Sequence, residues 1–364
     1  MSRETDRMPD LILFAAALLL VSLGLVMVFS SSSVLAMAET GDAFFYLKRQ
    51  LIGVAVGMIA MLVIMQIDYH IYQRFAILAV VVAYILLIAV LVIGTDISGS
   101  RRWINLRVIN LQPSELAKLA LVNFVAAYAA SRPHEMKNFW KGVATPLLVA
   151  AVFFGLIILE PDFGTAISMA GTAVIMLFAC GARLGHLVLV GIMSLPLFGA
   201  MIWLEPYRME RILSFLDPWA DPMNTGWNII QSLLAIGSGG LFGLGLGSSR
   251  QKFFYLPEQH TDFIFAILGE ELGFLGSIVT LVLFFVLAWR GFRIALRSPD
   301  LFGCFLAVGI TSMIILQAIL NIGVVSGILP VTGVTLPFIS FGSSSMVVTL
   351  AGVGILLNIS KQTR

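Results

Sequence analysis

Long apolar segments constrain the fold of this chain more than any other feature. About ten of them approach the roughly 20 residues that a helix needs to cross a bilayer. They are continuous and do not alternate in polarity, which argues against the strands of a membrane barrel. Of 364 residues, 59% are apolar and 12% charged, whereas soluble domains carry roughly 25% charged residues. The sequence therefore predicts an all-α polytopic membrane protein, with residues 1–364 forming a single integral membrane domain.

The apolar runs set the expected helix boundaries. The predicted helices span residues 10–30, 50–67, 75–94, 114–131, 144–159, 163–181, 185–203, 263–289, 302–323 and 341–359. An even number of spans places both termini on one side of the membrane, and the positive-inside rule identifies that side as the cytoplasm. Of the 22 Lys and Arg residues, 12 then fall in cytoplasmic segments. These are Arg3, Arg7, Arg74, Arg132, Lys137, Lys141, Arg183, Arg290, Arg293, Arg297, Lys361 and Arg364.

Most of the remaining cations fall in two outer loops, although short outer loops usually avoid them. The first loop carries Arg101, Arg102 and Arg107 around Trp103, a mixture suited to the membrane interface. The second is the long extracytoplasmic loop between helices seven and eight, residues 204–262, and it holds Arg208, Arg211, Arg250 and Lys252. Loops of this length are usually functional or disordered. Its aromatic, Pro and Leu/Ile content favours order, with a short amphipathic helix near residues 225–236.

A charged pair opens the predicted fourth helix. Pro113 suits the first helical turn, so Glu115 and Lys118 lie one turn apart on the same face. Charged groups inside a bilayer are costly and are therefore candidates for function. Two interpretations remain open: a structural ion pair that fixes helix packing, or a polar floor to a substrate cavity.

Acidic residues also surround the start of the predicted eighth helix. Asp262 stands where the outer loop becomes this helix, so it could be an N-cap, as could Thr261. A carboxylate at this boundary could also act as a general base, because partial desolvation raises its pKa toward neutrality. His260 is expected to bind or hydrogen-bond rather than to act as the base. Glu270 and Glu271 point to nearly opposite helix faces, so at most one shares a cavity with Asp262.

A glycine-rich run lies within the second of these outer loops, before the predicted eighth helix. Residues 237–247 contain six glycines and precede Arg250 and Lys252. Backbone amides of such a run could form a nest for phosphate oxygens. A tight re-entrant turn that requires small residues is the favoured alternative, because the run lacks the Gly-Lys-Ser/Thr ending of a Walker loop.

Together, the outer cations, interfacial aromatic residues and boundary carboxylate predict a site for an amphipathic anion presented by the outer leaflet. A lipid pyrophosphate meets that description. The net charge of +2 gives no support for a nucleic-acid partner. The two cysteines, Cys180 and Cys304, predict neither a disulfide framework nor a structural zinc site.

Six motifs, in order along nearly the whole chain, resemble the SEDS family of shape, elongation, division and sporulation proteins, which includes FtsW, RodA and SpoVE. They are Gly99–Ile104, Gln112–Lys118, Phe215–Trp219, Tyr255–Glu258, His260–Phe263 and Pro337–Ser340. The Arg-Arg-Trp and Phe-Leu-Asp-Pro-Trp stretches look more like FtsW or SpoVE than RodA, which implies a role in division or sporulation.

The resemblance implies a peptidoglycan glycosyltransferase in the bacterial cytoplasmic membrane. Its substrate would be lipid II, a disaccharide peptide on undecaprenyl pyrophosphate, and a class B penicillin-binding protein would cross-link the product. In this hypothesis Asp262 deprotonates the acceptor sugar's 4-hydroxyl, which displaces the donor's pyrophosphate with inversion. Substrate binding is expected from Arg101, Arg102, Trp103, Glu115, Lys118, Arg208, Arg211, Lys252 and His260. A divalent cation, Mg²⁺ or Mn²⁺, could assist the cations.

The competing hypothesis is a flippase that moves lipid II across the membrane. In that case Glu115, Lys118 and one of Glu270 or Glu271 would line a polar route, with Asp262 as a gate or cap. The clustering of cations on the outside favours the enzyme. A scaffold for division proteins explains the intramembrane charges least well.

Overall fold

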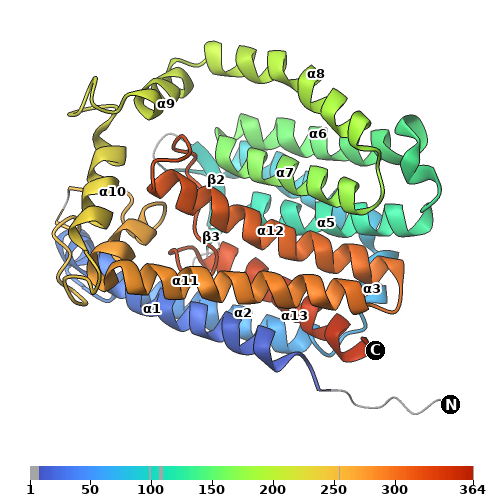
Figure 1. The fold of residues 1–364 in the computed structure, drawn as a ribbon, viewed down its shortest axis with the longest axis horizontal. Helices are drawn as coiled ribbons and strands as arrows, with labels where there is room; N and C mark the ends of the chain where they lie inside the picture. Colours follow the sequence, from blue (N-terminus) through green and yellow to red (C-terminus); the bar gives the residue numbers. More distant parts are fainter. Residues whose placement is uncertain (1–7, 98–99, 106–109, 254, 364) are drawn as a thin grey trace.

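The computed structural model is a bundle of long helices closed at one end by loops, short helices and a small sheet (Figure 1). It describes residues 8–97, 100–105, 110–253 and 255–363. The long helices are α1 (Leu11–Thr40), α2 (Phe45–Ile64), α4 (Ala76–Ile93), α5 (Pro113–Ser131), α6 (Ala144–Leu159), α7 (Phe163–Ala179), α8 (Leu184–Trp203), α11 (Ile264–Arg297), α12 (Leu301–Val325) and α13 (Ser343–Gln362). Shorter helices are α3 (His70–Arg74), α9 (Pro206–Leu216) and α10 (Trp227–Ser238), with η1 (Glu135–Lys137) and η2 (Phe139–Val143) before α6.

Each of the ten predicted membrane helices has a counterpart in the bundle. Among the described residues, eight helices are long and apolar enough to cross a membrane, and α7 is a shorter apolar helix. The predicted amphipathic helix near 225–236 corresponds to α10, whereas α9 was not predicted. The described part of the chain begins and ends at one end of the bundle, and β2, β3 and α10 lie toward the other (Figure 1). The all-α polytopic fold is therefore confirmed.

The first helix ends ten residues later than predicted, because its polar serine-rich segment stays helical inside the bundle. Ser31 and Ser32 each donate to the carbonyl of Val28, so the serines bond to the helix itself. At its start, Asp10 caps α1 by accepting from Leu13 N at 2.9 Å. The same carboxylate accepts from Arg290 Nε at 2.8 Å, which ties α1 to α11 at the end that carries the termini.

The first outer loop forms strands, which the sequence did not predict. Strands β1 (Thr95–Ile97), β2 (Ser100–Asn105) and β3 (Asn110–Leu111) form an antiparallel sheet in the order β1-β2-β3. Arg107, one of the predicted outer cations, lies outside the described residues. The sheet leads into α5 through Gln112, whose backbone N donates to Ser344 Oγ at 3.1 Å.

Helix α11 is interrupted at Gly273, in its N-terminal third, and the glycine-rich run packs into the interruption. Gly273 has φ 67° and ψ −163°, so the regular ladder breaks there. Leu244 N and Gly245 N donate to the carbonyls of Glu270 and Glu271, each at 3.0 Å. Phe274 N in turn donates to Gly240 O at 2.9 Å. These bonds satisfy the backbone groups that the break exposes. The favoured alternative, a tight turn of small residues, is the arrangement found.

Gly243→Ala should destabilise this junction. The glycine has φ +80°, and an added Cβ would lie 2.1 Å from Glu271 O. Left-handed backbone strain with a backbone clash should cost about 2 kcal/mol or more. Gly237→Ala is the matched control, since an added Cβ there meets nothing within 4 Å. Thermal unfolding in detergent should show a lower midpoint for Gly243→Ala alone, and equal midpoints would contradict the inserted-turn assignment.

Candidate active site

A cavity of about 1440 Å³ opens at the end of the bundle opposite the termini. It is lined by α1, α2, β2, α7, α9 and the loops before α11 and α13. Seven of the predicted site residues line it: Arg102, Trp103, Glu115, Arg208, Arg211, His260 and Asp262. Segments far apart in the sequence thus converge on one space.

The segment that carries Asp262 is held by three hydrogen bonds from outside it. Phe341 N donates to His260 O at 2.9 Å. Ser340 Oγ donates to Thr261 O at 2.5 Å. Asn321 Nδ2, on α12, donates to Asp262 O at 2.7 Å. Three consecutive carbonyls are therefore fixed, which gives the Pro337–Ser340 motif a structural role.

Asp262 does not cap the helix that follows it, because helix α11 begins without a side-chain cap hydrogen bond. Burial raises the pKa of Asp262 from 3.8 to about 7, the Glu258 charge adds to the rise, and Arg211 and Arg102 oppose it. A carboxylate with this pKa is suited to general-base catalysis near neutral pH.

Three arginines form what we call the cation wall: Arg102, Arg208 and Arg211. Each guanidinium is anchored to the chain. Arg102 Nε donates to Glu160 O at 3.1 Å, Arg208 Nη1 to Met201 O at 2.9 Å, and Arg211 Nη1 to Val331 O at 3.0 Å. Each guanidinium has five N–H donors, so further donors remain available for a pyrophosphate.

Asp162 lies beside the cation wall and was not predicted. It caps α7 by accepting from Thr165 N at 3.1 Å, and it also accepts from Gln112 Nε2 at 3.3 Å. Arg211 lies within range of the charges of both Asp162 and Asp262. The polar sequence from Glu160 to Asp162 between two apolar runs was the available signal.

Glu160 is a buried carboxyl group just before Asp162. Neither of its oxygens has a hydrogen-bond partner among the described residues. Burial raises the pKa of Glu160 to about 9, and the Asp162 charge adds to the rise. Glu160 is therefore protonated at neutral pH and does not add a negative charge beside the arginines.

Glu115 and Lys118 form a buried ion pair connected to the cavity. Lys118 Nζ donates to Glu115 Oε1 at 2.9 Å and to Gln317 Oε1 at 2.6 Å. Gln317 Nε2 donates to Thr335 O at 3.0 Å. Glu115, Gln317 and Thr335 line the cavity, whereas Lys118 lies behind them. The pair therefore connects α5 to α12 through Gln317, and of its two members Glu115 lines the cavity.

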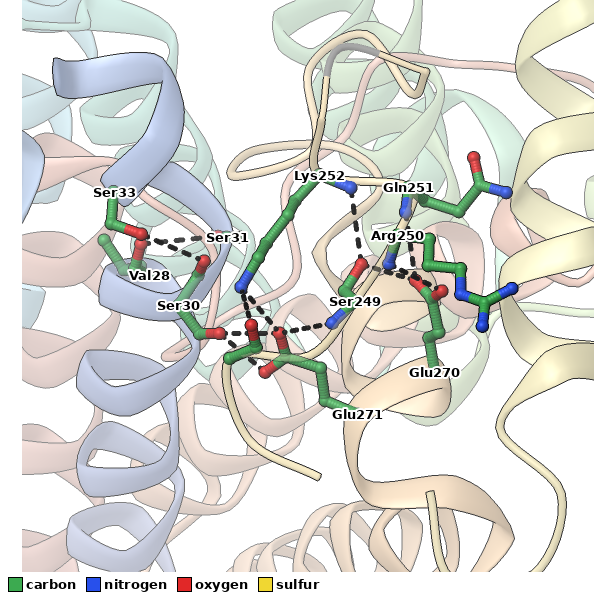
Figure 2. Close-up of polar contacts among 11 residues, drawn as sticks. Val28, Ser30, Ser31, Ser33, Ser249, Arg250, Gln251, Lys252, Glu270 and Glu271 are labelled. Carbon is green, nitrogen blue, oxygen red and sulfur yellow. Dashed lines mark hydrogen bonds and ion pairs between the residues drawn. The ribbon is translucent and has the colours of Figure 1, made fainter. Parts of the chain in front are cut away.

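Lys252 and Arg101 do not line the cavity. Figure 2 shows Lys252 in a separate polar network, where its Nζ lies 3.5 Å from Glu271 Oε1. Glu271 also accepts from Ser30 Oγ at 2.7 Å. Glu270 accepts from Arg250 N at 2.9 Å, so neither acidic residue is directed into the cavity. This network fastens the 249–252 turn to α1 and α11.

Aromatic rings and carboxylates, in contrast to the arginines of the cation wall, line the cavity where α1 and α2 reach it. The rings of Tyr46 and His260 lie 4.5 Å apart, and Phe341 packs edge-on against Tyr46 at 5.1 Å. Tyr46 OH donates to Glu39 Oε2 at 2.8 Å. We call this group, together with Glu258, the aromatic wall; all five residues line the cavity.

A divalent cation was expected from the sequence as a possible aid to the arginines. Among the described residues no group of three or more His, Cys, Asp or Glu side chains is placed to hold a metal ion. Mg²⁺ often relies on one or two carboxylates together with substrate phosphates. The described protein residues alone do not provide a full ligand set.

Known proteins resemble this chain over nearly its whole length. Stage V sporulation protein E of Bacillus subtilis (strain 168) is 49% identical over 358 residues, covering 98% of each chain. A probable peptidoglycan glycosyltransferase FtsW of Geobacter sp. (strain M18) is 43% identical over 357 residues, covering 98% of this chain and 97% of the relative.

Solved structures share the fold. A chain from a peptidoglycan synthase complex, studied for coordination of polymerization and crosslinking, matches with a TM-score of 0.81 and 32% identity over 98% of each chain. The rod shape determining protein RodA of Thermus thermophilus matches with a TM-score of 0.73 and 30% identity, covering 98% of this chain and 97% of that one. The family model for FtsW, RodA and SpoVE, described as cell cycle protein, matches residues 10–364. The chain belongs to this family.

Proposed function

We propose that this protein is a peptidoglycan glycosyltransferase that polymerises lipid II at the outer face of the bacterial cytoplasmic membrane, in division or sporulation. The observation that carries the proposal is the position of Asp262, whose pKa is about 7, within a cavity that it shares with three arginines. The similar relatives named peptidoglycan glycosyltransferase support the same activity.

Asp262 acts as the general base. It takes the proton from the 4-hydroxyl of the acceptor sugar, and the resulting oxygen nucleophile attacks the anomeric carbon of the donor. The bond from that carbon to the pyrophosphate breaks, and undecaprenyl pyrophosphate leaves with its electron pair. A single displacement of this kind inverts the anomeric centre and needs one positioned base.

The cation wall stabilises the leaving group. Negative charge grows on the pyrophosphate as the bond breaks, and anchored guanidinium groups aimed at it stabilise that transition state without reorganising. Because Arg102 and Arg211 use backbone carbonyls for part of their bonding, their orientation is set before substrate enters. Bidentate contacts to phosphate oxygens are the geometry that arginine favours.

Both termini are then cytoplasmic, because the cavity lies at the opposite end of the bundle. The class B penicillin-binding protein expected from the sequence is the proposed partner, and the match to a chain from a synthase complex supports it. The flippase hypothesis has less support. Glu115 and Lys118 are paired with each other, and Glu270 and Glu271 are bound in the network of Figure 2.

The test compares two activities of the purified protein. Fluorescent lipid II is supplied in detergent with the class B partner, and glycan chains are resolved by electrophoresis. In parallel, vesicles containing the protein are assayed for movement of lipid II between leaflets. Glycan chains without movement support the enzyme; movement without glycan chains overturns the proposal.

The polymerisation rate should depend on pH through Asp262. Below a pH of about 7 the carboxylate becomes protonated and cannot accept the hydroxyl proton. The initial rate at saturating lipid II should therefore fall about 10-fold per pH unit well below this value and level off above it. A rate that is flat between pH 5.5 and 8 would exclude Asp262 as the base.

A further inference from the structure

The cavity has two chemically different walls, and Asp262 lies within electrostatic range of both. Arg211 feels the charges of Asp262, Arg102 and Asp162. His260 feels those of Glu258 and Glu39. Of these three groups, Asp262 is the one whose pKa is influenced by charges on both walls. Glu258 belongs to the aromatic wall, and Arg211 and Arg102 belong to the cation wall. Asp262 is therefore within electrostatic range of charges on both walls.

The aromatic wall is unsuited to a pyrophosphate. Glu39 and Glu258 place two carboxylates there, and like charge would repel the phosphates. Arg49 also lines the cavity, with its guanidinium over the Phe45 ring at 4.4 Å, and the two carboxylates outnumber it among the described lining residues of this wall. An anionic leaving group is therefore directed to the cation wall.

The same wall suits a neutral sugar. Carboxylates accept hydrogen bonds from hydroxyl groups, and the aromatic rings offer an apolar face to the carbon side of a pyranose ring. Tyr46 and Phe341 are half-buried, so their rings remain accessible from the cavity. Pockets of this kind, with a few polar groups among apolar ones, commonly fix the orientation of a ligand.

Two buried polar atoms near this wall have no hydrogen-bond partner among the described residues. His260 is 8% exposed, and its Nδ1 has no hydrogen-bond partner in the part of the chain that the structure describes. Within the same described ranges, Oε1 of the neighbouring Gln259, which is 3% exposed, also has no partner. Buried polar groups in native proteins are normally satisfied.

The chain connects this wall rigidly to the base. His260 is two residues before Asp262, and the carbonyls of both are fixed by Phe341 N and Asn321 Nδ2. A sugar lying against Tyr46 and His260 therefore has a defined position relative to the carboxylate that takes its proton.

We propose that Tyr46, His260 and Phe341, with the carboxylates of Glu39 and Glu258, form the acceptor-sugar subsite, and that Arg102, Arg208 and Arg211 bind the donor pyrophosphate. This assignment rests on the proposed function and divides its single cavity into two subsites. The acceptor's 4-hydroxyl meets Asp262 from the aromatic wall, and the donor's anomeric carbon meets it from the cation wall.

Two lipid II analogues separate the subsites. The donor analogue has its 4-hydroxyl methylated and cannot act as acceptor. The acceptor analogue has a methylene group in place of the oxygen between the anomeric carbon and the pyrophosphate, so it cannot act as donor. Together they give a single tetrasaccharide, and varying each in turn with the class B partner present gives a separate KM for donor and for acceptor.

Tyr46→Ala should raise the acceptor KM about 10-fold, as loss of an aromatic contact predicts, with the donor KM within about 2-fold of wild type. Tyr46→Phe keeps the ring and should show a smaller rise. Arg211→Gln should raise the donor KM and leave the acceptor KM close to wild type. Tyr255→Ala is the matched control, because this exposed tyrosine does not line the cavity; it should change neither constant. Thermal stability is measured for every variant.

The outcomes are distinguishable. If wild type forms tetrasaccharide and Tyr46→Ala raises the donor KM, or leaves both constants unchanged, the subsite assignment is wrong and the proposed function stands. If wild type forms no tetrasaccharide from the analogues and no glycan from lipid II, the proposed function fails and the assignment with it.

Discussion

Asp262→Asn should reduce glycan polymerisation by about 10³-fold or more while the protein stays folded. The amide has nearly the shape of the carboxylate but cannot take the acceptor's proton, and positioned acid–base groups contribute about 10²–10⁴-fold. The backbone anchors should persist, because Asn321, Ser340 and Phe341 bind main-chain carbonyls and not the Asp262 side chain. Lipid II polymerisation with the class B partner measures the loss.

Stability distinguishes this result from unfolding. The pKa of Asp262 is raised from 3.8 to about 7 in the folded protein. The stability that its protonated form contributes is therefore complete below pH 3.8 and is lost as the pH rises through about 7. The neutral amide would not carry that penalty, so Asp262→Asn should have an equal or higher unfolding midpoint at pH 8. Glu210→Gln, which changes an exposed carboxylate outside the cavity, is the control and should retain activity. Near wild-type chain formation by Asp262→Asn would refute the mechanism.

The sequence was sufficient for the helical fold because bilayer-spanning segments carry a strong local signal. Their length and apolar composition gave all ten long helices, and only boundaries moved, as at the serine-rich end of α1. Strand β2 and helix α9 were missed. Strand β2 is short and contains Arg and Trp, so its sequence shows no clear alternation of polar and apolar residues. Helix α9, Pro206–Leu216, lies within the long segment 204–262, which was interpreted as a loop because of its length.

Cavity-lining residues were predictable where charge stood out against an apolar background, as at Asp262, Arg102 and Arg211. Polar residues on otherwise apolar helices gave no such signal. Gln317 and Asn321 lie on α12, and their role depends on loops that meet them only after folding. At Lys252, charge led to a prediction of substrate binding, but the side chain does not line the cavity. The break in α11 places Glu271 beside it instead. Such pairings follow from tertiary structure alone.

Asn321→Leu should lower turnover about 10²-fold with little change in KM. Asn321 Nδ2 donates to Asp262 O and to Val334 O, each at 2.7 Å, and the side chain is 1% exposed. The first bond fixes the base; the second fixes the loop after Gly333, where an added Cβ would lie 3.6 Å from Asp262 Oδ2. Leucine has a similar size and no donor, so both carbonyls lose a partner and the base loses its alignment.

Asn358 offers a matched comparison at the other end of the bundle. Its amide also bridges two backbone groups, accepting from Tyr69 N and donating to Met65 O, each at 3.0 Å. Asn358→Leu should therefore lower the unfolding midpoint by a similar amount and leave turnover close to wild type. If both variants lose stability and turnover equally, Asn321 is structural only. Both variants are expected to lose similar stability, so stability alone does not distinguish the two buried amides. A selective loss of turnover in Asn321→Leu, with lipid II binding retained, would identify Asn321 as a positioning residue.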